Sequence, residues 1–270
     1  MSDPIQSEFL WPPRPLTDPT PPAVSPPLTP PPRTRRNAVA RAWIDIERIW
    51  LDPVAEPLDR RAGRLNWRRA SPGDWCDRCG ANVGPNEADE LGCAQCRGRR
   101  LPWDRFVRLG DYEPPLSTWV QEVKFGGWRA LGRSLGRELG RAALEAGFEG
   151  AGGAVVPAPT TFRRRMARGI DHALVLARGV SCETGAPVRR LLQRTHRPSQ
   201  RGLSPAQRTS NVAGSFSVRR GAPTGGPIIL IDDVMTTGAT LRAASRVLRR
   251  GVRPSELWVC VTSVARPLDG

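Results

Sequence analysis

The feature that most restricts the fold of this chain is a run of apolar residues followed directly by two acids and a turn of small residues. Residues 228–231 (Ile-Ile-Leu-Ile) are apolar throughout, Asp232 and Asp233 follow, and residues 236–240 read Thr-Thr-Gly-Ala-Thr. A continuous apolar run of this kind is typical of a strand buried on both faces of a parallel sheet. Residues 238–250 continue with a helical pattern, so the segment predicts a strand, a turn and a helix in succession.

This arrangement favours a phosphorylated sugar as the ligand. Open α/β folds bind ligands at the carboxyl ends of their strands, which is where the two acids would lie. The N–H groups and hydroxyls of the turn, with the positive end of the helix, can hold a phosphate, while the carboxylates accept hydrogen bonds from ribose hydroxyls. The alternative is a plain strand, turn and helix whose acids only cap the turn. The predicted ligand residues are Asp232, Asp233, Thr236, Thr237, Gly238, Ala239 and Thr240.

A second motif consists of two Cys-x-x-Cys pairs separated by thirteen residues. Each pair can offer both sulfur atoms to one tetrahedral ion, and four thiolates leave no open position for water or substrate. Gly80 and Gly92 supply the backbone freedom that such turns need. A structural Zn²⁺ is therefore predicted, with an iron–sulfur cluster, a redox dithiol pair or free thiols at a coincidental spacing as alternatives. The predicted metal ligands are Cys76, Cys79, Cys93 and Cys96.

The hydrophobic pattern divides the 270 residues into four parts. Residues 1–36 are rich in proline and predict a disordered tail. Residues 37–70 predict a helix and a basic linker from Arg60 to Arg69, and residues 71–104 form the four-cysteine module. Residues 105–270 are expected to form an α/β domain with a mostly parallel, twisted sheet and helices on both faces.

Within the α/β domain, strands are predicted to alternate with helices. We expect the last helix to be closed by Gly251. The predicted strands are residues 106–112, 154–156, 188–194, 227–233 and 257–264, and the predicted helices are residues 116–125, 131–148, 171–183 and 238–250.

The positive charge is concentrated in the α/β domain. The formal net charge is +15, and residues 157–220 carry 13 Arg against only Asp171 and Glu183. Such a field attracts phosphates, pyrophosphate or a nucleic-acid backbone. A coding bias is the alternative for any single Arg, because 40 of the 41 basic residues are Arg and only Lys124 is Lys.

The residues quoted above carry a specific resemblance. The segment 228–241 resembles the phosphoribosyl-pyrophosphate (PRPP) motif of type I phosphoribosyltransferases, and together with the preceding cysteines the chain resembles the ComF family. Residues 123–127 (Val-Lys-Phe-Gly-Gly) and 155–159 (Val-Val-Pro-Ala-Pro) also resemble segments of that family. The resemblance covers roughly residues 76–265. Asp171 and His172 depart from it, since the family pattern has Asn and Gln there.

The resemblance implies the type I phosphoribosyltransferase fold, PRPP as ligand and Mg²⁺ accompanying it. It also implies a role in DNA uptake during natural transformation. It leaves the acceptor unknown and names no catalytic residue, so enzymatic turnover stays open. Candidates for the pyrophosphate and a second loop are Lys124, Arg163, Arg164, Arg165, Arg168, Arg208 and Asn211.

Two candidate residues have competing interpretations. Lys124 is interpreted either as a contact of the pyrophosphate or as a solvated residue after an amphipathic helix. His172 is an acid, a base or a stacking ring, although a lone His between a loop and a helix is more often structural. His196, beside Arg197 and Pro198, is expected in a surface loop.

Three functions compete for the whole chain. The first is transfer of a phosphoribosyl group to an unknown acceptor. The second is the handling of single-stranded DNA, alone or with DNA-uptake proteins, by a protein that keeps the fold without turnover. The third is a PRPP-sensing regulator. No apolar run of about 18 residues is present and the N-terminus is rich in proline, so we expect a cytoplasmic protein without membrane insertion.

Overall fold

The computed structural model describes residues 56–160, 170–194, 215–219 and 225–265. All of them belong to one compact unit, Arg48–Gly270. The predicted proline-rich tail and the helix predicted before residue 53 lie outside the described residues.

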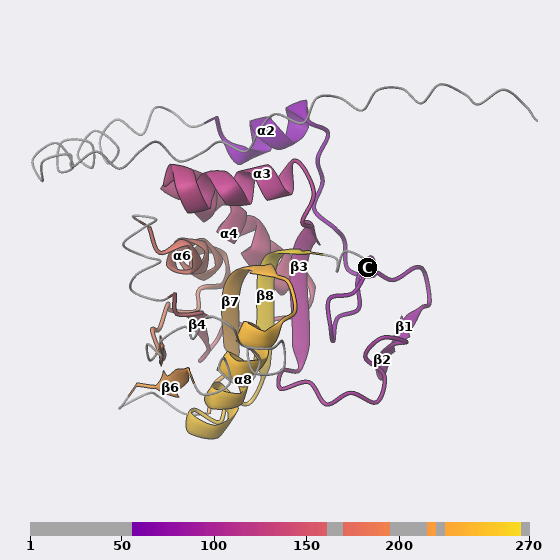
Figure 1. Ribbon diagram of the computed structural model, residues 1–270, viewed down its shortest axis with the longest axis vertical. Coiled ribbons are helices and arrows are strands. Elements are labelled where there is room, and N and C mark those ends of the chain that lie inside the picture. Colours follow the sequence, from indigo (N-terminus) through magenta and orange to yellow (C-terminus); the bar gives the residue numbers. More distant parts are fainter. Residues whose placement is uncertain (1–55, 161–169, 195–214, 220–224, 266–270) are drawn as a thin grey trace, which may run out of the picture. The chain divides into compact units, whose positions relative to one another are not determined.

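A four-stranded parallel sheet forms the centre of the α/β domain (Figure 1). Its strand order is β3-β8-β7-β4, and every neighbouring pair is parallel. The strands are β3 (Arg105–Asp111), β4 (Ala154–Pro157), β7 (Ile228–Met235) and β8 (Leu257–Val264). The helices are α3 (Leu116–Gln121), α4 (Arg129–Glu145), α6 (His172–Thr184) and α8 (Ala239–Gly251).

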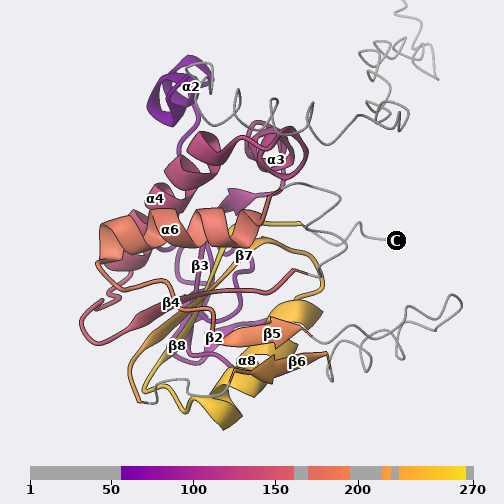
Figure 2. The same cartoon turned by 90° about the vertical axis from the view of Figure 1, so that its left-hand side faces the viewer.

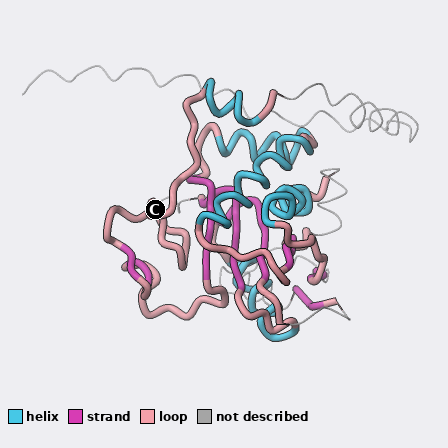
Figure 3. The backbone as a smooth tube through the Cα atoms, turned by 180° about the vertical axis from the view of Figure 1, so that it is seen from behind, coloured by secondary structure: helices cyan, strands magenta, loops and turns pink. Residues whose placement is uncertain are grey.

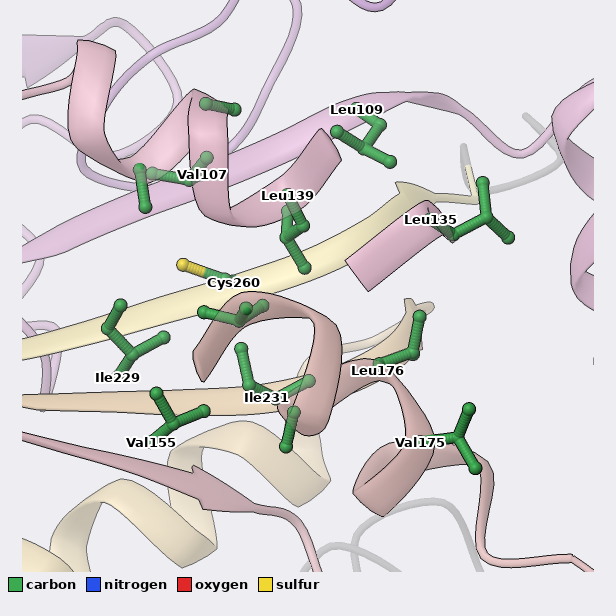
Figure 4. Packing of buried hydrophobic residues seen from close by; sticks show 14 of the residues in the cluster. Val107, Leu109, Leu135, Leu139, Val155, Val175, Leu176, Ile229, Ile231 and Cys260 are labelled. Carbon is green, nitrogen blue, oxygen red and sulfur yellow. The ribbon is translucent and has the colours of Figure 1, made fainter. Parts of the chain in front are cut away.

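Helices cover both faces of this sheet, as Figure 2 shows with α4 and α6 on one side and α8 on the other. The alternation of side chains along β7 explains this arrangement. Ile229 and Ile231 belong to the core on the side of α4 and α6 (Figure 4), whereas Ile228 and Leu230 belong to the core that contains α8 residues. Because successive side chains of a strand point to opposite faces, a fully apolar strand needs cover on both. The predicted fold class is confirmed.

Helices α4 and α6 pack closely because glycines face the neighbouring backbone. A Cβ atom on Gly136 would lie 2.2 Å from the carbonyl oxygen of Leu176, and one on Gly179 would lie 2.3 Å from that of Arg133. Any larger side chain would force the helices apart. This contact fixes the start of α6, and therefore His172, relative to α4.

The predicted helix over residues 116–125 is divided in two. Helix α3 ends at Gln121, and a π-helical turn, η1 (Glu122–Gly126), follows. Gly127 then ends the turn with φ 72°, in the left-handed region that favours glycine. Single π-helical turns are frequent at functional sites.

Three predictions for local structure need correction. The expected linker contains helix α2 (Leu58–Arg64), whose Arg61 forms a 2.6 Å ion pair with Glu122. The strand expected over residues 188–194 is reduced to a single parallel bridge between Val188 and Val155 of β4 and to the short β5 (Leu192–Arg194), which pairs antiparallel with β6 (Phe216–Val218) outside the main sheet.

The third correction concerns the end of α8. The helix runs through Gly251, and Arg253 adopts the left-handed conformation with φ 52°. A Cβ atom on Gly251 would lie 2.7 Å from Cγ2 of Val218. Gly251 is therefore needed for the close approach of β6 and not to end the helix.

The four-cysteine module contacts the first strand of the sheet. It contains a small hairpin, β1 (Ala88–Asp89) with β2 (Gly92–Cys93), which Figure 3 shows apart from the strands of the main sheet. The indole of Trp75 donates a 3.1 Å hydrogen bond to the carbonyl oxygen of Phe106 in β3, and the amide of Phe106 donates a 2.6 Å bond to the carbonyl oxygen of Asp77.

Candidate functional site

The two adjacent acids lie near the carboxyl end of β7, as the sequence predicts. Asp232 is half-buried, and Asp233 is 8% exposed. Oδ1 of Asp232 accepts a 2.9 Å hydrogen bond from the amide of Asp233, and Oδ1 of Asp233 accepts a 2.7 Å bond from the amide of Val234. One oxygen of each carboxylate is thus held by the strand itself, while the other carboxylate oxygen, Oδ2, takes no part in these two bonds.

The turn after β7 leads directly into the N-terminus of helix α8. Gly238 is the N-cap of α8 with φ 68°, a conformation in which glycine has no steric penalty. Thr236 and Thr237 are exposed, and Thr237 Oγ1 accepts a 3.4 Å bond from the amide of Ala239. The guanidinium of Arg242 donates to the carbonyl oxygen of Thr237 and ties the turn to the helix.

Lys124 and His172 converge on one of the two acids. Lys124 Nζ lies 3.0 Å from Asp233 Oδ2, and His172 Nε2 lies 3.0 Å from the same oxygen. Lys124 comes from the π-helical turn and His172 is the first residue of α6, where Asp171 caps the helix by accepting from the amide of Leu174. The structure therefore brings Lys124 to the acid pair, and it buries His172.

The two acids have opposite pKa shifts. Burial, and then the negative charge of Asp233, raises the pKa of Asp232 to about 7. Burial would also raise the pKa of Asp233, but the hydrogen bond and charge of His172 and the charge of Lys124 outweigh it and hold that pKa below its ordinary value. Asp233 is therefore the stable carboxylate, and Asp232 exchanges a proton near neutral pH.

A cavity of about 200 Å³ lies at this edge of the sheet. Both acids, the start of α8 and the end of β4 reach it, and its walls are mostly polar. Arg194, from β5, and Thr160, just after β4, also line it, although the sequence analysis named neither. The signal for Thr160 was its place in the loop that follows the predicted strand. The lining residues are Lys124, Ala158, Pro159, Thr160, His172, Arg194, Asp232, Asp233, Val234 and Thr240.

Several predicted site residues lie outside the described residues. They are the candidates of the pyrophosphate and second loops, and nothing in the structure tests their roles. They are Arg163, Arg164, Arg165, Arg168, Arg208 and Asn211, together with His196.

Two larger cavities lie elsewhere. One of about 530 Å³ is at the amino ends of β4 and β7, lined largely by glycines and by Arg189. One of about 1010 Å³ lies between the four-cysteine module and β3. Only the smallest of the three contains both acids and a residue of the predicted phosphate turn.

The four cysteines form a compact cluster. Sγ of Cys76 lies 3.6 Å from Sγ of Cys96, Cys79 lies 3.6 Å from Cys93, and Cys93 lies 3.9 Å from Cys96. A tetrahedral ion with Zn–S bonds of about 2.3 Å needs edges of about 3.8 Å. None of the four forms a disulfide. The cluster has the geometry to bind a metal such as zinc.

Both glycines predicted to shape this cluster adopt left-handed conformations. Gly80 has φ 79° and Gly92 has φ 93°. A Cβ atom on Gly92 would lie 2.4 Å from Sγ of Cys96, so a larger residue would displace a ligand. The prediction for both glycines is confirmed.

Comparison with known proteins identifies relatives of similar identity and coverage. The chain is 31% identical to competence protein F of Haemophilus influenzae over 192 residues, which cover 68% of this chain and 82% of that protein. It is 28% identical to the DNA utilization protein YhgH of Escherichia coli K12 and 30% identical to that of Salmonella typhimurium, with the same coverage. No protein-family model matches the chain.

Among solved structures, the chain is similar to the glutamine PRPP amidotransferase of B. subtilis complexed with ADP and GMP. The TM-score is 0.35 and the identity 23%, over 50% of this chain and 26% of that enzyme. A second structure, described as the allosteric regulatory enzyme of purine biosynthesis, has the same TM-score at 22% identity.

The parallel sheet with an acid pair at its carboxyl edge, and the four-cysteine cluster before it, define an α/β protein with an N-terminal four-cysteine module. The relatives identify the family within this class. The chain belongs to the ComF family of competence proteins. In the described part of the chain, no helix combines the length and the hydropathy that crossing a membrane requires.

Proposed function

We propose that this protein binds PRPP in the cavity at the carboxyl end of β7. The observation that carries the proposal is the arrangement of the two acids and Thr240, at the start of α8, around one polar cavity of about 200 Å³. The 5′-phosphate would be held by the N–H groups and hydroxyls of residues 236–240, at the positive end of a 13-residue helix. Ribose hydroxyls would donate to the acids.

Mg²⁺ would enter with PRPP and neutralise charge on the pyrophosphate. A dedicated protein site for it does not fit the cluster of His172, Asp232 and Asp233, although their ligand atoms lie within 4.8 Å of one another. The ammonium of Lys124, 3.0 Å from Asp233, already occupies the position of a cation. The ion would therefore be coordinated mainly by oxygens of the ligand and by water.

We further propose transfer of the phosphoribosyl group to an acceptor that is still unidentified. The bond from C1 of the ribose to the pyrophosphate oxygen would break, pyrophosphate would leave with the bonding electrons, and a nucleophilic atom of the acceptor would bond to C1. The protein would act by positioning and by stabilising charge. The names of the relatives, competence protein F and DNA utilization protein, favour a place in DNA uptake.

The four-cysteine cluster is proposed to hold one structural Zn²⁺. All four coordination positions would be sulfur, so the ion would have no open position for catalysis. Its role would be to stabilise the small module that contacts β3.

Calorimetric titration of the metal-loaded protein with PRPP, with and without Mg²⁺, tests the binding proposal. We expect saturable binding that depends on Mg²⁺ and is abolished by chelation of Mg²⁺. In the double variant Asp232→Asn, Asp233→Asn we expect affinity to fall at least about 100-fold, since the acid pair at the ribose site loses both of its charges. Asp89→Asn is the matched control, because Asp89 carries the same charge on an exposed side chain of the module. Wild-type protein that shows no binding would reject the proposal.

A second candidate function, the handling of single-stranded DNA, is supported by a cluster of arginines near the turn. Burial, and then the positive charges of Arg246 and Arg99, lowers the pKa of Arg242. Mutually repelling guanidinium groups attract a phosphate backbone. Binding of a labelled oligonucleotide across a salt series tests this candidate: affinity should fall steeply with salt and be unaffected by Mg²⁺ chelation.

A further inference from the structure

The two adjacent acids of β7 have very different surroundings. Oδ2 of Asp233 lies 3.0 Å from both Lys124 Nζ and His172 Nε2, and the three side chains are 12%, 15% and 5% exposed. Within the described residues, no cationic group lies within ion-pair distance of Asp232. Both acids line the cavity, but only Asp233 is in contact with two basic side chains of the described residues.

Three separate elements are shaped to form this cluster. The wide π-helical turn and the left-handed Gly127 carry Lys124 to β7. A Cβ atom on Gly126 would lie 2.6 Å from the ring of Trp128, so this backbone path admits little else. The close packing of α4 against α6 fixes the start of α6 and hence His172. Because three elements that are distant in sequence contribute to it, the cluster depends on the tertiary fold and not on the local conformation of β7 alone.

The contact between His172 and Asp233 identifies the role of the histidine. Its side chain is 5% exposed, and its Nδ1 has no hydrogen-bond partner among the described residues. Within these residues its one ion-pair contact is with Asp233 Oδ2, 3.0 Å from Nε2. An Nε2–H donor is what a carboxylate requires. A glutamine can donate the same bond through its amide, whereas an aliphatic side chain cannot.

We propose that the two acids have separate tasks: Asp233 is a positioning residue that holds Lys124 and His172 in the wall of the cavity, and Asp232 is the acid that touches the ligand. Lys124 and His172 act through Asp233 and do not contact the ribose. The first half of this proposal stands without any ligand, and the second half rests on the proposed binding of PRPP.

The single lysine of the chain makes the first half directly testable. Because Lys124 is the only Lys among 41 basic residues, an amine-selective reagent modifies one side chain, which mass spectrometry of the corresponding peptide quantifies. In ligand-free protein, Asp233→Asn should raise the rate of modification about tenfold, since it removes the carboxylate that holds Lys124 Nζ at 3.0 Å and keeps its side chain only 15% exposed to the reagent. The matched change Asp232→Asn should alter this rate less than about threefold. Equal effects of the two changes would overturn the proposal.

The histidine is tested by substitution and by NMR. The chain has only two His, so the Nε2–H signal of His172 can be assigned with a His196→Gln variant. We expect this signal in wild-type protein and its loss in Asp233→Asn. His172→Gln should keep Lys124 as protected as in the wild type, whereas His172→Leu should expose it. If the Gln and Leu variants behave alike, His172 is not a positioning residue.

PRPP titration tests the second half. Asp232→Asn should weaken binding at least about 30-fold, Asp233→Asn about fivefold, and His172→Gln less than about twofold, since a direct charge-assisted contact contributes more than its support. Thermal unfolding and metal content verify that each variant is folded. If wild-type protein does not bind PRPP, the proposed function fails while the lysine experiment still decides the cluster. If Asp233→Asn weakens binding as much as Asp232→Asn, the division of tasks is wrong.

Discussion

The four-cysteine cluster and the acid pair are both groups of ionisable side chains, but they compensate their charge in different ways. Around Asp233, the chain supplies its own counter-charges in Lys124 and His172. The sulfur atoms of the four cysteines of the module lie within 4.8 Å of one another, so four thiolates there would repel each other in a largely buried space. The difference teaches that the acid site can exist fully formed without its ligand, whereas the module as thiolates requires an external cation.

Removing a metal ligand should have the largest effect. Cys76→Ser should abolish metal binding and unfold the module, at a cost of several kcal/mol, because metal-binding energy is folding energy in small metal domains. Metal analysis and thermal unfolding measure both results. Cys182→Ser is the control, because Cys182 is exposed in α6 and outside the cluster. A metal-free preparation with an intact module would remove the contrast between the two sites.

Removing the internal cation of the acid site should have the next largest effect. Lys124→Met keeps the length of the side chain but leaves Asp233 with only His172, so the free energy of unfolding should fall by about 3 kcal/mol. Denaturant unfolding measures the change. Lys124→Arg, which keeps the charge, should cost clearly less. A Met variant as stable as the wild type would show that the acid site does not depend on its counter-charge.

The smallest effect is a pH dependence that separates the two acids. Asp232 has a folded-state pKa of about 7, above its unfolded value, because of burial and of Asp233, with Lys124 and His172 acting in the opposite direction. A raised carboxyl pKa weakens folding above the unfolded pKa, so Asp232→Asn should stabilise the protein by about 1 kcal/mol at pH 8.

The gain from Asp232→Asn should shrink as the pH falls from about 7 towards 4, because the native Asp232 then takes up its proton. Asp233, whose pKa is depressed, contributes stability above its unfolded pKa that is lost as the pH falls below it. Thermal unfolding over this pH range measures both trends. A constant difference between the Asn variant and the wild type from pH 4 to pH 8 would contradict the assignment of the raised pKa.

The local chemistry of this chain was predictable from its sequence. An apolar run, two acids and a small-residue turn specify β7, the acid pair and the start of α8, because strand, turn and helix preferences act over a few residues. The spacing of the two Cys-x-x-Cys pairs predicts their cluster for the same reason. The alternation of strands and helices was sufficient for the fold class.

Only the tertiary structure decided which distant segments of the chain contact one another. Lys124 and His172 reach Asp233 because a π-helical turn and a tight helix pair bring three elements together, and no periodicity in the sequence encodes that meeting. Gly251 looked like the end of a helix, yet it is glycine because β6 packs against it. Local preferences act along the chain, whereas close approach and charge compensation depend on which surfaces the fold places in contact.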